Sequence, residues 1–120
     1  MKTNTALIKS KAFALRVINL YKYLQSRKKE FIMSKQILRS GTSIGANLAE
    51  AECAISKKDF LSKIYIALKE CSETQYWLDL LKDANYIEAK QYESMFADCN
   101  ELTKMLTATT KTINTRELLK

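Results

Sequence analysis

The chain has 120 residues, 47% of them hydrophobic, with two glycines and no proline, so it suits one domain over residues 1–120 and offers too few turn residues for a strand-rich fold. No stretch approaches about 18 uncharged apolar residues, which predicts no transmembrane helix and no membrane partner. The three cysteines lack C-x-x-C spacing and are expected to be buried thiols, which indicates a reducing, cytoplasmic compartment. The net charge of +7 arises from residues 1–40, where ten Lys or Arg accompany one acid, and this asymmetry indicates an anionic partner unless it only solvates the surface.

The first helix is predicted over about residues 5–26, where apolar residues recur every three or four positions. A basic connector follows it. The cations around this junction are the candidate nucleic-acid-binding residues: Lys22, Arg27, Lys28, Lys29, Lys35 and Arg39. Such side chains neutralise phosphates whatever the base sequence, so binding would be salt-sensitive. Tyr21 and Tyr23 lie nearby, but Tyr21 belongs to the core stripe, so no aromatic stacking platform is expected beside these cations.

The second helix is predicted over about residues 34–53 and holds both glycines of the chain. A glycine inside a helix costs about 1 kcal/mol relative to alanine. Gly41, Gly45 and Ala49 recur at intervals of four, and small residues at that spacing let another helix backbone come close. We therefore expect a tight helix–helix contact along this face.

The third helix is predicted over about residues 57–84. Ser56 can cap it, with Asp59 at the acidic position of a capping box and Ile55 and Phe60 at the positions of a hydrophobic staple. Asn85 is the expected left-handed residue beyond its end.

This third helix has apolar residues on two sides. Ile66, Trp77 and Leu80 lie opposite the expected core side, where a surface helix should be polar. In so short a chain the second cover would come from another subunit, so we expect a homo-oligomer whose interface includes these three residues.

The fourth helix is predicted over about residues 88–113, and the tail, residues 114–120, is expected to fray. Four long amphipathic helices with short connectors predict an all-α, antiparallel, up-down-up-down four-helix bundle. Di-iron sites in such bundles need Glu-x-x-His pairs, and the chain has no histidine. We therefore expect no metal, no cofactor and no enzymatic activity, since the usual general base is missing as well.

Five polar residues on the second and third helices are expected to form a hydrogen-bonded structural network: Ser43, Asn47, Glu50, Glu70 and Glu73. A carboxylate buried between helices or subunits must be paired or hydrogen-bonded to be tolerated. Such a network fixes the register of the helices more than it adds stability.

Several segments resemble the bacterial four-helix bundle family that includes proteins encoded in intervening sequences of large-subunit ribosomal RNA genes. They are Ser43-Ile-Gly-Ala-Asn47-Leu-Ala-Glu50, Ser56-Lys-Lys-Asp-Phe60, Ile66-Ala-Leu-Lys-Glu70-Cys-Ser-Glu73 and Tyr76-Trp77-Leu78. The chain is also similar to the accessory variability determinant of diversity-generating retroelements. Family members often have glycine where this chain has Ala51, so the turn after the second helix is expected to differ slightly.

The resemblance implies a bundle assembled as a homopentamer, with a nucleic-acid-binding role and no enzymatic activity. It also places Ser43, Asn47 and Glu50 at polar family positions, and Glu70 and Glu73 at acids of the closer relatives. We thus expect an oligomeric protein that binds the backbone of RNA or DNA through its basic surface. The alternative is an interaction scaffold or adaptor without nucleic-acid contact, whose basic third meets an acidic protein such as a polymerase-like partner.

Overall fold

The computed structural model describes residues 4–118, which form four helices without any strand. Their bounds are α1 (Asn4–Ser26), α2 (Met33–Ala51), α3 (Lys57–Asp83) and α4 (Ala89–Leu118). The prediction of an all-α chain with four helices is confirmed.

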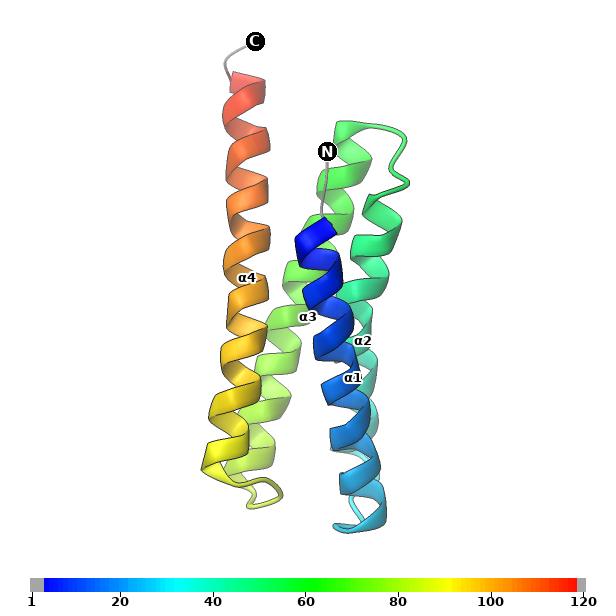
Figure 1. The fold of residues 1–120 in the computed structure, drawn as a ribbon, viewed down its shortest axis with the longest axis vertical. Coiled ribbons are helices and arrows are strands. Elements are labelled where there is room, and N and C mark those ends of the chain that lie inside the picture. The colour runs from blue at the N-terminus through cyan, green and yellow to red at the C-terminus, as the bar shows by residue number, and fades with distance from the viewer. Residues whose placement is uncertain (1–3, 119–120) are drawn as a thin grey trace.

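Successive helices run in opposite directions, as Figure 1 shows, and α4 returns to pack against α1. The molecule is elongated, measuring 54 × 22 × 20 Å. The α1–α2 and α3–α4 connections lie together at one end of the bundle, and the α2–α3 connection lies at the other. Two distant segments, near residues 27–32 and 84–88, therefore share one end of the molecule.

One apolar core runs along the bundle, and every helix contributes to it. Its buried side chains include Phe13 of α1, Ile44 of α2, Leu78 of α3 and Leu106 of α4. These residues belong to the stripes that recur every three or four positions in the sequence. Burying one such side chain contributes roughly 1.5–3 kcal/mol, so this core holds the helices and fixes where the connections emerge.

The two glycines of α2 face α1, and the expected close contact is confirmed there. A Cβ added at Gly41 would lie 2.8 Å from Cγ2 of Val17, and one at Gly45 would lie 3.0 Å from Oγ of Ser10. Ala49 does not share this contact and is exposed. Eight residues at about 100° each turn its side chain roughly 80° away from that of Gly41.

The start of α3 carries the predicted cap. Ser56 Oγ accepts a hydrogen bond from the N–H of Asp59 at 3.0 Å, and the Asp59 carboxylate accepts one from the N–H of Ile55 at 3.2 Å. The predicted hydrophobic staple is wrong, because Phe60 is buried while Ile55 is 93% exposed. At the other end of the helix, Asn85 has the expected left-handed backbone, with φ 66°.

Two helix ends differ from the predicted ones by more than one residue. Bonds of the tighter i−3 type, from the N–H of Cys53 to Glu50 and of Ala54 to Ala51, end α2 two residues early. The fourth helix continues to Leu118, which corrects the frayed tail predicted from residue 114; residues 119–120 lie outside the described part. The extension has a physical basis, because Ile113 is buried and Arg116 favours the negative end of the helix dipole.

Candidate nucleic-acid interface

The α1–α2 connection is held by a single buried acid. The carboxylate of Glu30 accepts hydrogen bonds from the backbone N–H groups of Ile32, Met33 and Ser34 at 3.1, 3.0 and 2.7 Å. Its own N–H donates to the carbonyl of Leu24 at 2.9 Å. Glu30 thereby satisfies the first amides of α2 and ties them to the end of α1, as an N-cap side chain would.

The electrostatics of this site keep Glu30 ionised. Burial alone would favour the neutral acid, but the three N–H groups and the Ser34 hydroxyl outweigh it and hold the pKa of Glu30 below its ordinary value of 4.5. The positive end of the α2 dipole acts in the same direction. The one acid of this segment is therefore occupied internally.

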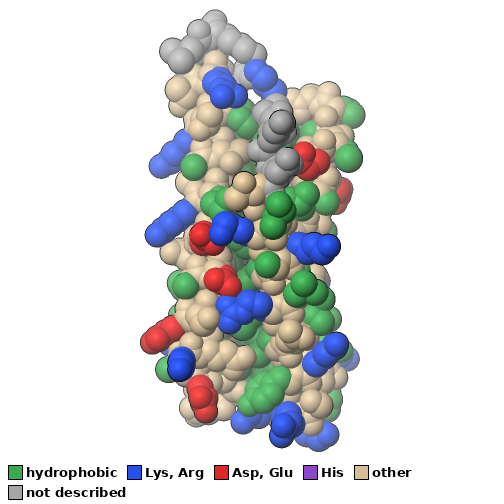
Figure 2. Space-filling view, in the orientation of Figure 1, with side chains coloured by type: hydrophobic (Ala, Val, Ile, Leu, Met, Phe, Trp, Pro, Cys, Tyr) green, Lys and Arg blue, Asp and Glu red, His purple; other side chains and the backbone are tan. Residues whose placement is uncertain are grey.

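Five of the six predicted nucleic-acid-binding cations are exposed around this connection. Figure 2 shows Lys and Arg side chains gathered at this lower end of the molecule. Within residues 4–118, no carboxylate lies within ion-pairing distance of Lys22, Arg27, Lys28, Lys29 or Lys35. Their charges are therefore available to an outside anion.

The sixth predicted cation, Arg39, has a different role. Its guanidinium pairs with Glu70 on α3, with Nη1 3.2 Å from Oε2, and its Nη2 contacts Glu73. Glu73 also accepts a hydrogen bond from Nε1 of Trp77 at 3.0 Å. Arg39 lies on the side of α2 that faces α3, so its charge is neutralised within the protomer. This geometry does not favour a role for Arg39 in binding nucleic acid.

The predicted structural network is divided into separate contacts. Ser43 donates to the carbonyl of Arg39 at 2.6 Å and Asn47 to that of Ser43 at 2.8 Å, so both bonds stay inside α2. Glu50 instead pairs with Lys63 of α3 at 3.4 Å. Ser43 and Asn47 each bond to the carbonyl four residues earlier, which a side chain on a helix can reach without a partner helix.

The buried polar link between α2 and α3 involves two residues that the sequence reading missed. Thr74 Oγ1 lies 2.9 Å from Ser40 Oγ and donates to the carbonyl of Glu70 at 2.8 Å, and both side chains are fully buried. Each lies on a buried face of its helix, Ser40 between Ile37 and Ile44 and Thr74 between Cys71 and Leu78, and a hydroxyl at such a position needs a partner. That requirement was the available signal for this pair.

The predicted oligomer interface on α3 is largely covered within one protomer. Trp77 and Leu80 are half-buried, Trp77 against the core, and Ile66 alone of the three is exposed, at 38%. The reason is angular: Trp77 lies beside α2 rather than opposite the core. Larger apolar exposure occurs on the outer face of α1, where Ile8 is 70% and Leu15 54% exposed.

Three apolar side chains at the cation-rich end were not assigned any role from the sequence. Phe31 and Ile32, in the connection, are 49% and 76% exposed, and Tyr23 of α1 is 38% exposed. Lys28 Nζ lies 5.9 Å from the centre of the Tyr23 ring, within cation–π range. For Phe31 and Ile32 a signal was available in the sequence, because two large apolar residues in a basic connector lie outside every helical core stripe.

The cysteines divide into two environments. Cys71 and Cys99 are buried. The pKa of the Cys99 thiol is raised, mainly by its hydrogen bond with Cys71 and secondly by its burial. Cys53 is exposed just beyond α2, which corrects the expectation that all three thiols are buried. It lies outside the core because α2 ends at Ala51.

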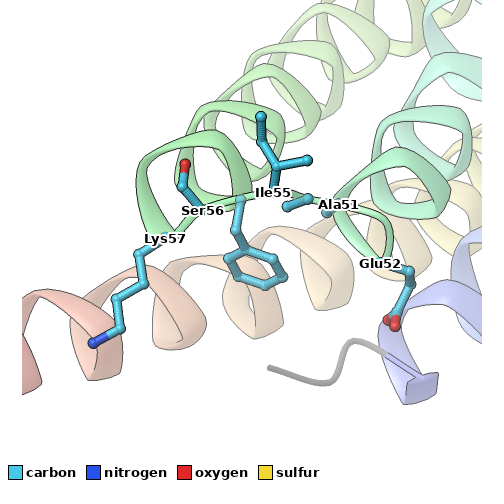
Figure 3. Close-up of a pocket in the computed structure, with 7 residues that line it drawn as sticks. Ala51, Glu52, Ile55, Ser56 and Lys57 are labelled. Carbon is cyan, nitrogen blue, oxygen red and sulfur yellow. The ribbon is translucent and has the colours of Figure 1, made fainter.

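A hollow of about 240 Å³ lies at the opposite end of the bundle, under the α2–α3 connection (Figure 3). Glu52 and Lys57 on its rim extend away from each other to the two sides of the turn. Charged groups do not converge on this space, so it lacks the arrangement of a polar ligand pocket.

The described residues 4–118 contain no group of three or more His, Cys, Asp or Glu side chains placed to hold a metal ion. Over the same range, none of the four helices has both the length and the apolar composition needed to cross a membrane.

The fold and this end together define an all-helical protein with a cation-rich connection between its first two helices. The chain belongs to the 23S rRNA-intervening sequence protein family, whose sequence profile matches residues 2–108, and the resemblance noted from the sequence is confirmed. A solved structure of a protein of unknown function from the S23 ribosomal protein family of Bacteroides thetaiotaomicron is 56% identical, covering 92% of this chain and 99% of that one with a TM-score of 0.90. No curated protein matches the chain.

Proposed function

We propose that this protein binds nucleic acid through the α1–α2 end, without catalysis, by neutralising backbone phosphates. The observation that carries the proposal is the group of exposed cations at this end without a carboxylate partner in the described chain, two of which are Lys28 and Lys29. The single acid among them, Glu30, is saturated by backbone amides. A polyanion would thus meet positive charge undiminished by internal pairing.

The family description refers to 23S rRNA, which makes RNA the first polyanion to test. Contacts to phosphates position a protein on the nucleic acid without reading its base sequence. We therefore expect this surface to bind RNA and DNA of many sequences. The reducing cytoplasm, where free thiols such as Cys53 persist, is the compartment that suits this role.

Self-association belongs to the same proposal. Ile8 and Leu15 expose apolar surface on α1, on the side away from the core, and a second copy would cover it. The pentameric form rests on the family resemblance. Several copies of one weak basic surface would bind a long polyanion with greater avidity than one copy.

The test compares two triple variants of equal net charge in anisotropy titrations with labelled RNA. One is Arg27→Gln, Lys28→Gln, Lys29→Gln, and the control is Lys58→Gln, Lys104→Gln, Lys111→Gln, whose side chains are exposed on α3 and α4. We expect the first variant to bind roughly tenfold or more weakly at low salt and the control to bind nearly as the native protein does. Equal affinities of the two variants would contradict the proposed site.

An acidic protein could occupy the same cations, because a run of carboxylates offers similar charge. Capture of partners from a lysate with and without nuclease separates the two possibilities. If the native protein retains its partner after nuclease and the first triple variant loses it, the interaction is with protein and the scaffold function replaces the one proposed here.

A further inference from the structure

Two aromatic residues at the cation-rich end, Phe31 and Tyr23, are partly exposed. Phe31 is about half exposed, and Tyr23 exposes more than a third of its surface. Phe31 follows directly on Glu30, whose side chain is fixed under the start of α2, so the backbone that carries the Phe31 ring is held in place. A partly exposed ring on a fixed backbone offers its π face to an outside ligand.

Building on the proposed function, we infer that this end takes single-stranded nucleic acid in particular. Phe31 and Tyr23 stack against unpaired bases, and Arg27, Lys28 and Lys29 neutralise the adjoining phosphates. Proteins that bind single strands without sequence preference combine these two elements, because every unpaired base presents a face to an aromatic ring. A duplex hides those faces, and would engage the cations alone.

The surroundings of Tyr23 support a base-sized ligand. Tyr23 and Lys28 line an open hollow of about 340 Å³ with Lys82, Asn85 and Tyr86 of the α3–α4 connection, a volume at the lower end of the range for ligand pockets. Glu88 also lines it, and its carboxylate can accept hydrogen bonds from base amino groups but repels phosphate. A second open hollow of about 460 Å³, along the α1–α4 seam, is also lined by Tyr23 and Glu88, so these two residues separate the two hollows or border both.

An anionic membrane is the rival occupant, because Ile32 is exposed beside Phe31. Two such side chains, already partly covered in the protein, have only their remaining apolar surface to bury in a bilayer. A single myristoyl chain, with more apolar surface, gives only marginal anchoring. The hollow beside Tyr23 has room for a planar base, and Lys28, whose Nζ lies 5.9 Å from the centre of the ring, can meet the adjoining phosphate.

The experiment uses three probes of one length: an unstructured single strand, the same strand annealed to its complement, and a single strand of abasic sugar-phosphate. The full chain is compared with Phe31→Leu, which keeps an apolar side chain but removes the π face, and with Ile32→Asn as the matched control. Far-UV circular dichroism and thermal midpoint confirm that both variants fold, as expected for exposed positions.

We expect Phe31→Leu to weaken binding to the single strand by roughly 5- to 150-fold, the range for losing one stacked base. Its binding to the duplex and to the abasic strand should be unchanged. Ile32→Asn should leave binding to all three probes unchanged. Tyr23→Leu should repeat the selective loss for the single strand.

Three outcomes overturn the inference. Equal binding of all three probes, with no selective effect of Phe31→Leu, would leave phosphate binding in place and remove the base stacking. Loss of binding to phosphatidylcholine–phosphatidylserine vesicles in both Phe31→Leu and Ile32→Asn, with no selectivity for the single strand, would favour the membrane. Failure of every probe to bind at low salt would overturn the proposed function as well.

Discussion

The carboxylate of Glu30 accepts a hydrogen bond from the backbone N–H of Ser34 at 2.7 Å, while Ser34 Oγ donates to the carbonyl of Glu30 at 2.8 Å. Gln25 of α1 donates to the same hydroxyl at 3.2 Å. This reciprocal pair joins the end of α1 to the start of α2, and the basic connection between them is fixed as a result. Glu30 lowers the formal positive charge of the connection by one, yet its hydrogen bonds hold the backbone that carries the neighbouring cations.

Glu30 should make stability depend on pH. Its pKa is lowered in the folded state, so its stabilisation is present above the unfolded value of about 4.5 and is lost as the pH falls through the lower folded value. We expect Glu30→Gln to lower the free energy of unfolding by about 1 kcal/mol at neutral pH, with the difference shrinking in acid. Urea titrations of both proteins at several pH values measure this. Glu93→Gln, an exposed change, is the control, and a pH-independent difference would refute the role of the Glu30 charge.

The glycine contact should respond unequally to added methyl groups. Alanine favours a helix by about 1 kcal/mol over glycine, but at Gly41 its Cβ would lie 2.8 Å from the branched, stiff side chain of Val17. Overpacking of this kind typically costs about 1–3 kcal/mol. At Gly45 the nearest atom is the Ser10 hydroxyl at 3.0 Å, which can rotate. We therefore expect Gly41→Ala to lower the thermal midpoint and Gly45→Ala to be nearly neutral; the reverse order would show that α1 and α2 are not this close.

Arg39 should matter for stability and little for nucleic-acid binding. Its removal leaves the largely buried Glu70 without its ion pair. Because the Arg39 side chain is about half exposed, we expect Arg39→Ala to cost only about 1 kcal/mol in free energy of unfolding. Trp77, the sole tryptophan, reports the change through its fluorescence, since Glu73 bonds both Arg39 and the indole. Arg27→Ala provides the contrast, with unchanged unfolding and weakened RNA binding. An equal loss of RNA affinity in both variants would return Arg39 to the binding surface.

Self-association should depend on the outer face of α1. We expect Ile8→Lys combined with Leu15→Lys to lower the solution mass measured by light scattering, because two exposed apolar side chains would carry charge at the interface. Ile55→Lys makes the same chemical change at a position that is even more exposed but lies at the α2–α3 turn, and should leave the mass unaltered. A native protein of monomeric mass would refute the oligomer outright. A smaller mass after Ile66→Lys alone would restore the interface predicted on α3.

The positions of the helices could be predicted well from the sequence, but the contacts between side chains of different helices could not. Periodicity predicts four helices because a core stripe is a property of each segment alone, and the Ser56 cap is equally local. The partner of Arg39 depends on the angle at which α2 meets α3, which a single-helix reading does not contain. The contact between Ser40 and Thr74 depends on the same angle, although the need of each buried hydroxyl for a partner does not. Trp77 was predicted to need cover from another subunit because the periodicity of one helix does not show which neighbouring helix lies beside it.

The most direct test of nucleic-acid binding at the α1–α2 end is the salt dependence of the dissociation constant for single-stranded RNA, taken from about 50 to about 200 mM salt. Each phosphate contact contributes about 0.7 to the slope of log affinity against log salt for a single strand. Removing Arg27, Lys28 and Lys29 by substitution with Gln should therefore reduce the slope by about 2, while Lys58→Gln, Lys104→Gln, Lys111→Gln should leave it unaltered. Identical slopes for the native protein and both variants would contradict phosphate binding at this end.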